Sequence, residues 1–184
     1  MTMRTILMAA AVGAATLVSG CASNRPAPTE HEVAALGASA EVAFDDLEKQ
    51  FPWVRRRARE AHAYAIFPNV TKGAAGIGGA AGDGLVYRRG DLIGTVRMSQ
   101  VSVGAQIGGS SFRELILFED ERALRRLIVG EMEASANASA VAGDNGAAAA
   151  NDYNDGVAVY VVAVGGLLLD ASIGTQDFDF DYLD

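Results

Sequence analysis

"GAAGIGGAAGDGLVY", residues 73–87, places six glycines in its first twelve residues and then turns apolar. Every second residue from Ala74 to Gly84 is glycine or alanine, so a strand here would have one nearly flat side. Glycines inside a strand mark a sharp bend or a surface that another element approaches closely. The stretch therefore predicts a curved strand that lies beneath a helix, followed by a turn at 88–91.

The same glycines also match a nucleotide-binding pattern, because residues 76–81 read G-x-G-x-x-A. That fingerprint needs a helix directly after the loop, since the helix N-terminus holds the pyrophosphate. Here the following residues, "DGLVYRRGD", read as a strand that runs into a turn, and no Walker lysine follows. Nucleotide binding is therefore disfavoured, and no cofactor is expected.

The first twenty residues, "MTMRTILMAAAVGAATLVSG", have the features of an export signal: a cationic start, an apolar run and small residues. They end at Cys21, and residues 18–21 resemble the bacterial lipoprotein signal, in which the cysteine is lipidated and becomes the new N-terminus. A plain signal peptide and an uncleaved anchor are the alternatives. The apolar stretch is shorter than the roughly 18 to 20 residues of a spanning helix.

Cys21 is also the one cysteine of the chain, so no internal disulfide is expected. Ala22 and Ser23 follow it, and the lack of an aspartate there resembles lipoproteins of the Gram-negative outer membrane. Residues 21–28 carry two prolines and no apolar period, which predicts a short tether. The expected organisation is a signal peptide over 1–20, a tether over 21–28 and one domain over 29–184, facing the periplasm.

Charge is distributed unevenly along the chain. Residues 21–100 hold ten Lys and Arg against nine Asp and Glu, whereas residues 101–184 hold four against fourteen. Phosphate contacts need clustered cations, so an acidic half without a basic stripe argues against nucleic acid as a partner.

Helical periodicity comes first in the domain and alternation follows. Thr29 and Glu32 form a capping box for a helix up to Phe51, and a second helix is expected from Trp53 to about Tyr64. Beyond Pro68 the period becomes two, apart from one inserted helix within 119–131. The stretch 101–108 alternates valine, alanine and isoleucine with serine, glycine and glutamine, which predicts a half-buried strand.

Two further features concern the end of the chain. Gly165 and Gly166 separate two apolar runs, which predicts a two-residue hairpin. Residues 175–184 alternate aromatic and acidic side chains, as an amphipathic last strand with a charged outer face would.

No catalytic or metal-binding constellation stands out. "HEVAA" at 31–35 begins like a zincin helix but has Ala35 where the second histidine belongs, and His62 is the other histidine of the chain. "GGSSF" at 108–112 lacks the nucleophile-elbow pattern. An enzyme is therefore not expected.

Arginines offer a surface role, because four of them fall within residues 55–59. They could face anionic headgroups, each contributing about 1 kcal/mol near a charged surface, although an ordinary solvated helix face is the simpler explanation. Tethering at Cys21 would keep them close to a bilayer. The candidate lipid contacts are Arg55, Arg56, Arg57, Arg59, Lys72, Arg88 and Arg89.

Taken in order, the motifs resemble the SYLF lipid-binding domain family. They are "AYAIFPNVTKGAAGIGGAAGDGLVY", "SVGAQIGGSSFRELILF", "DERALRRLIVGE", "ANASAVAG" and "NDYNDGVAVYVVAVGGLLLDASIG", and the resemblance covers about residues 30–178. It implies an α+β fold with a curled, barrel-like antiparallel sheet covered by N-terminal helices and one inserted helix. Eukaryotic members bind phosphoinositide membranes and a yeast relative binds actin, while bacterial members are often exported lipoproteins.

This chain departs from the eukaryotic pattern, since no basic amphipathic helix stands at its front. The resemblance therefore implies lipid binding without a defined headgroup. The expected function is that of a non-enzymatic, lipid-anchored envelope lipoprotein whose domain binds membrane lipids. The alternative is a structural module that contacts an envelope protein and meets the bilayer only through its anchor.

Overall fold

Three very long strands dominate the computed structural model of the protein. The structure describes residues 28–132, 134–135, 140–141 and 153–183. Of these, it describes only the backbone at 104–106, 134–135, 140–141 and 166–175. The long strands are β1 (Ala63–Arg88), β2 (Asp91–Phe118) and β5 (Val157–Tyr182), and the short ones are β3 (Ala134–Ser135) and β4 (Ala140–Val141). The helices are α1 (Glu30–Gln50), α2 (Val54–Glu60) and α3 (Glu121–Ile128). The expected signal peptide, Cys21 and nearly all of the tether lie outside the described residues.

α1 begins where the sequence predicts. The Thr29 hydroxyl accepts a hydrogen bond from the backbone N–H of Glu32, and the Glu32 carboxylate accepts one from the backbone N–H of Thr29. α2 is shorter than expected, because β1 already begins at Ala63. Within the described part of the chain, none of the helices combines the length and the apolar character needed to cross a membrane.

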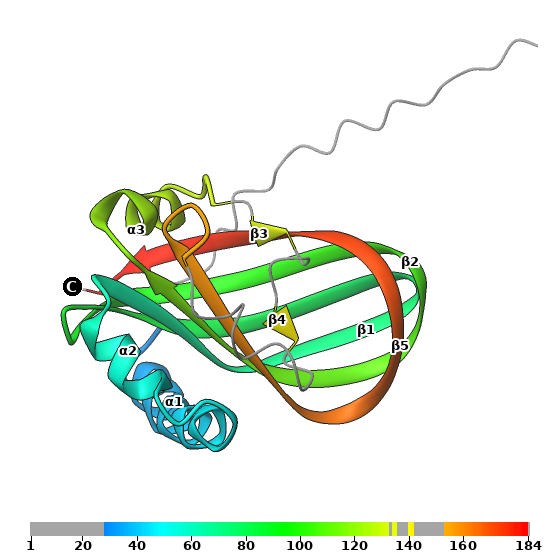
Figure 1. Ribbon diagram of the computed structural model, residues 1–184, viewed down its shortest axis with the longest axis horizontal. Coiled ribbons are helices and arrows are strands. Elements are labelled where there is room, and N and C mark those ends of the chain that lie inside the picture. The colour runs from blue at the N-terminus through cyan, green and yellow to red at the C-terminus, as the bar shows by residue number, and fades with distance from the viewer. Residues whose placement is uncertain (1–27, 133, 136–139, 142–152, 184) are drawn as a thin grey trace, which may run out of the picture.

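The sheet is antiparallel along its long strands, in the order β1-β2-β5-β3, with β4 added parallel to β5 (Figure 1). β1 and β2 are joined by the two residues Arg89 and Gly90, which have positive φ angles of 53° and 92°. Two such residues make the turn whose twist suits a hairpin. The fold is therefore α+β with a curled sheet, as the sequence predicts.

β1 curls so far that its two ends pack face to face. A Cβ atom at Gly84 would lie 2.7 Å from the carbonyl oxygen of Ile66, and one at Gly82 would lie 2.8 Å from that of Asn69. The predicted close approach at the glycines is real, but the approaching element is the first part of β1 itself rather than a helix. The strict alternation also breaks at Gly76, which has φ +80° and sits at a register shift.

Two hydrophobic cores lie on opposite faces of this sheet. The outer core packs Ile66, Leu85, Leu115, Leu117, Ala158 and Tyr160 against α1 and α2. The inner core lies inside the curl, with α3 beside it, and contains Phe67, Val70, Val86, Val96, Met98, Ile116, Phe118 and Phe178. Consecutive residues at the end of β2 thus enter different cores, so both faces of the strand are buried there.

The hairpin expected at Gly165–Gly166 is wrong. β5 continues without a turn through these residues, which pair with Ser111 and Ser110 of β2. The irregularity falls just before the glycines, where the register shift between Ser111 and Phe112 leaves Val164 without a partner in β2. Pairing along nearly the whole length of β2 keeps β5 extended, and the local glycine pair does not reveal this influence.

Candidate functional site

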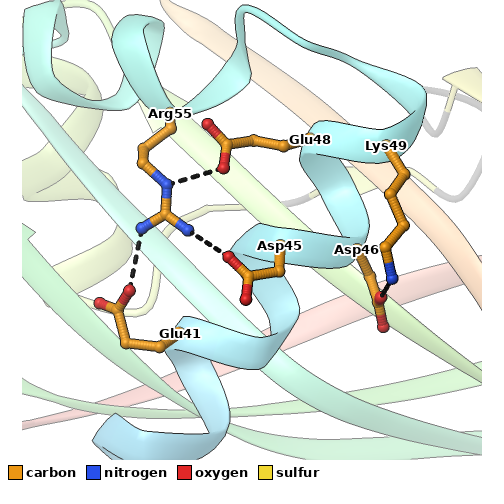
Figure 2. Close-up of polar contacts among 6 residues, drawn as sticks. All are labelled: Glu41, Asp45, Asp46, Glu48, Lys49 and Arg55. Carbon is orange, nitrogen blue, oxygen red and sulfur yellow. Dashed lines mark hydrogen bonds and ion pairs between the residues drawn. The ribbon is translucent and has the colours of Figure 1, made fainter.

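Arg55 of α2 connects the two outer helices, because its side chain pairs with carboxylates of α1. Its guanidinium lies 2.9 Å from the Glu41 carboxylate, 3.0 Å from that of Asp45 and 2.9 Å from that of Glu48, as Figure 2 shows. It also lies 4.8 Å from the centre of the Phe44 ring. Burial disfavours the charged form, but the hydrogen bonds to Glu41 and Glu48 outweigh it and raise the pKa of Arg55. The positive charge of Arg55 is therefore balanced by carboxylates of the protein itself.

The other arginines of α2 differ in their surroundings. The guanidinium of Arg57 lies over the rings of Trp53 and Tyr153, with its carbon 6.0 Å and 5.3 Å from the ring centres. Arg56 and Arg59 are exposed. These two are the α2 arginines best placed to meet an anionic surface.

Arg88 and Arg89 lie at the β1–β2 turn, next to the end of α2. The backbone N–H of Arg89 donates to the carbonyl of His62, at 3.3 Å. Glu121 of α3 lies among these cations, 2.8 Å from the His62 ring and 3.8 Å from Arg88. The arginine end, by which we mean Arg56, Arg59, Arg88 and Arg89, therefore contains a carboxylate as well.

Lys72 is separated from all of these arginines. Its side chain is buried, at 9% exposure. Lys72 lies two residues after Val70 in β1 and therefore on the same face of the strand as this residue of the inner core. The structure thus divides the seven candidate lipid contacts into the arginine end, two arginines held by α1, α2 and Tyr153, and one buried lysine.

Polar side chains continue along the inner face of the sheet. Gln100, Ser102, Glu114 and Gln176 are all buried there. Burial raises the pKa of Glu114 to about 7, although a hydrogen bond from the Gln176 side chain acts in the opposite direction. Among the described residues, the Glu114 Oε1 atom has no hydrogen-bond partner.

The outer face of the sheet presents a surface that our sequence reasoning missed. α1 and α2 cover the outer face near the strand ends, whereas Ile77, Val101, Val103 and Ile107 stay exposed at 69%, 59%, 63% and 65%. We call these four side chains the tip face. The signal in the sequence was the absence of any charge over 73–82 and 98–112, beside strongly apolar residues.

Shallow depressions flank α1, with volumes of about 270 and 420 Å³. They lie between α1 and residues 162–164 of β5, and Arg113 and Asp46, which form an ion pair at 2.8 Å, contribute to their walls. Neither is lined by a pair of carboxylates. Nor do three or more His, Cys, Asp or Glu side chains gather as metal ligands anywhere in the described ranges.

Comparison with known proteins finds a distant similarity in sequence. No protein-family model matches the chain. The chain is similar to beta cell expansion factor A of Aeromonas veronii, with 29% identity over 148 residues, which is 80% of this chain and 56% of that protein. The chain thus matches little more than half the length of this curated relative, a level of similarity that suggests a distant relationship.

Proposed function

We propose that the protein is a non-enzymatic envelope lipoprotein, anchored through Cys21, whose curled-sheet domain binds a lipid surface. We also propose that the chain belongs to the SYLF family. This assignment is supported by the order of the motifs, and the curled antiparallel sheet with outer helices is the fold that this resemblance implies.

The tip face is the observation that carries lipid binding. Monomeric water-facing proteins expose single apolar residues commonly, but a contiguous apolar patch marks a binding surface. Ile77 and Val103 are directly paired across β1 and β2, and Val101 lies two residues along the same strand. Together with the charge-free sequence around them, they make a surface suited to an apolar environment.

Lipid binding is tested by flotation with vesicles. Both cores and all described helices and strands lie within residues 30–182, so the chain from residue 22 onward retains what the fold requires. This chain lacks Cys21 and the apolar leader, so any flotation reports the domain alone. Flotation with phosphatidylcholine vesicles is expected, and failure to float with neutral and with anionic vesicles would contradict the proposal.

Anchoring is tested separately in cells. The full chain is expected to incorporate a labelled fatty acid and to fractionate with membranes, whereas Cys21→Ser should lose the label. Cys21→Ser leaves the described domain unchanged, so this variant isolates the anchor. Equal labelling of both proteins would exclude Cys21 as the lipidated residue.

A second candidate function is a module that contacts another envelope protein. The exposed carboxylates of Asp177, Asp179 and Asp181 near the end of β5 favour it, because they form an acidic row that a cationic protein surface would match. Cross-linking in cells distinguishes the two functions. Recovery of one dominant protein partner, lost when the three aspartates become asparagine, would favour this second function.

A further inference from the structure

The alternation around the tip face is the reverse of what a sheet in water shows. Antiparallel sheets that face water usually turn apolar residues inward and polar residues outward. Along β2, however, Gln100 and Ser102 are buried at 6% and 1% exposure, while their neighbours Val101 and Val103 point outward. On this part of the sheet the polar side chains lie inside the curl and the apolar ones lie outside.

The segments of β1 and β2 that carry the tip face contain no charged residue, and the charged residue that β5 brings beside residues 101–107 is Asp170, which pairs with Gln106. Residues 73–82 and 98–112 contain no Asp, Glu, Lys or Arg. At the border, Asp83 and Arg97 neutralise each other through hydrogen bonds of 2.7 Å and 3.0 Å. The four side chains of the tip face therefore offer a partner apolar contact.

The position of these residues is also distinctive. Each long strand begins and ends near the helices: β1 follows α2, β2 leads into α3, and the turn at Arg89 is bonded to His62. The middle of each strand forms the far end of the curl (Figure 1). Ile77 and Val103 belong to these middle segments and lie on the convex side, since their strand neighbours Gly78 and Ser102 are buried.

A convex apolar surface limits the choice of partner. A rigid protein partner would need a matching hollow, and a second copy would present another convex tip, so two copies would bury little area. Lipid chains are fluid and close around a convex shape. The reversed alternation and the uncharged segments 73–82 and 98–112 likewise match a surface that faces hydrocarbon.

We infer that the tip face enters a lipid bilayer, so that the protein meets the membrane with the far end of its curled sheet and not with the arginine end. This inference rests on the proposed lipid binding and specifies its surface. Among the described strands β1 pairs only with β2, so its outer backbone groups need water or headgroups as partners. Insertion is therefore shallow and ends in the upper part of the acyl chains.

The test combines charge substitutions with a depth measurement. Val101→Lys/Val103→Lys in the chain from residue 22 onward is expected to lower the ratio of vesicle-bound to free protein by about tenfold, because ammonium groups must leave water to enter the bilayer. Val129→Lys is the matched control, since this valine is also half exposed, at 50%, but follows α3. Wild-type binding to phosphatidylcholine should change little between low and high salt.

Depth is read from a tryptophan at the tip. Val103→Trp in a Trp53→Phe background leaves one tryptophan in the chain. Its emission should shift to the blue on adding vesicles and be quenched most by lipids brominated near the headgroup end of the chain. Val129→Trp in the same background should show neither change.

The outcomes separate the inference from the function on which it rests. If wild-type protein floats but Val101→Lys/Val103→Lys floats equally well, or if Arg88→Glu/Arg89→Glu alone abolishes binding in a salt-sensitive way, the tip inference is overturned and lipid binding stands. If wild-type protein never floats, the proposed function itself fails. Light scattering that shows a dimer broken by Val101→Lys/Val103→Lys would assign the tip face to a second copy instead.

Discussion

Glu114 combines full burial with an ionisable group, and its protonation is coupled to folding. Burial raises its folded-state pKa to about 7, well above the ordinary 4.5. A carboxyl with a raised pKa holds its proton more tightly in the folded state. Its contribution to stability is therefore fully present below about pH 4.5 and is lost as the pH rises through about 7.

Glu114→Gln removes this dependence. From the shift in pKa, the free energy of unfolding of the wild type should fall by about 3 kcal/mol between acid and alkaline pH through this group, and the glutamine variant should lack that fall. Urea denaturation on either side of neutral pH measures it. Glu119→Gln, at an exposed glutamate, is the control, and a wild-type slope that survives in Glu114→Gln would show that other groups cause it.

Arg55 is the residue on which the junction of α1 and α2 depends. Arg55→Ala leaves Glu41, Asp45 and Glu48 close together without their common cation, and should lower the free energy of unfolding by about 1 to 2 kcal/mol, less at high salt. Thermal unfolding at two salt concentrations checks this. The neighbouring Arg56→Ala, at an exposed side chain, should change stability little, and equal losses in both variants would contradict the role given to the ion-pair network.

β1 shows how an element can be predicted while its packing is not. The glycine pattern over 73–84 indicates a bent strand with one flat side, and this is confirmed at Gly82 and Gly84. The partner is residues 66–70 of the same strand, which no local pattern reveals. A contact between the two ends of one strand depends on the curl of the whole sheet.

Gly84→Ala tests this contact. Its Cβ would meet the Ile66 carbonyl oxygen at 2.7 Å and the Phe67 ring at 2.8 Å, so the backbone would have to move and stability should fall by about 1 to 3 kcal/mol. At Gly73 no atom lies within 4 Å of a Cβ, so Gly73→Ala is the control and should be neutral or slightly stabilising. Chemical denaturation of both variants measures the difference, and a neutral Gly84→Ala would show that the ends of β1 are not tightly packed.

The whole molecule has two cores but one set of strands running through both. Leu117 enters the outer core and Phe118, the next residue, enters the inner core. Because the same backbone supports both cores, we expect them to unfold together. Trp53 packs against Phe51 and Tyr160 on the outer side and can report on that side alone.

Phe118→Ala should reveal the coupling. Removing this buried ring from the inner core should cost about 3 to 5 kcal/mol, and the loss should appear in the Trp53 fluorescence on the opposite face of the sheet. The unfolding transition measured by Trp53 fluorescence should coincide with the unfolding transition of the sheet measured by circular dichroism. Leu117→Ala serves as the comparison from the outer core, and separate transitions in Phe118→Ala would show that the cores are independent.

By itself, the sequence determined the features that depend on neighbouring residues: the capped start of α1, the inserted helix α3, the hairpin turn at 88–91 and the strands of period two. The tertiary structure decided which face of each strand meets water and where each strand ends. Alternation at 98–103 gives the period but not the direction, so only the curl places Ser102 inside and Val103 outside. Long-range pairing with β2 likewise keeps β5 extended through Gly165, because the hydrogen bonds of a whole ladder outweigh the turn preference of two glycines.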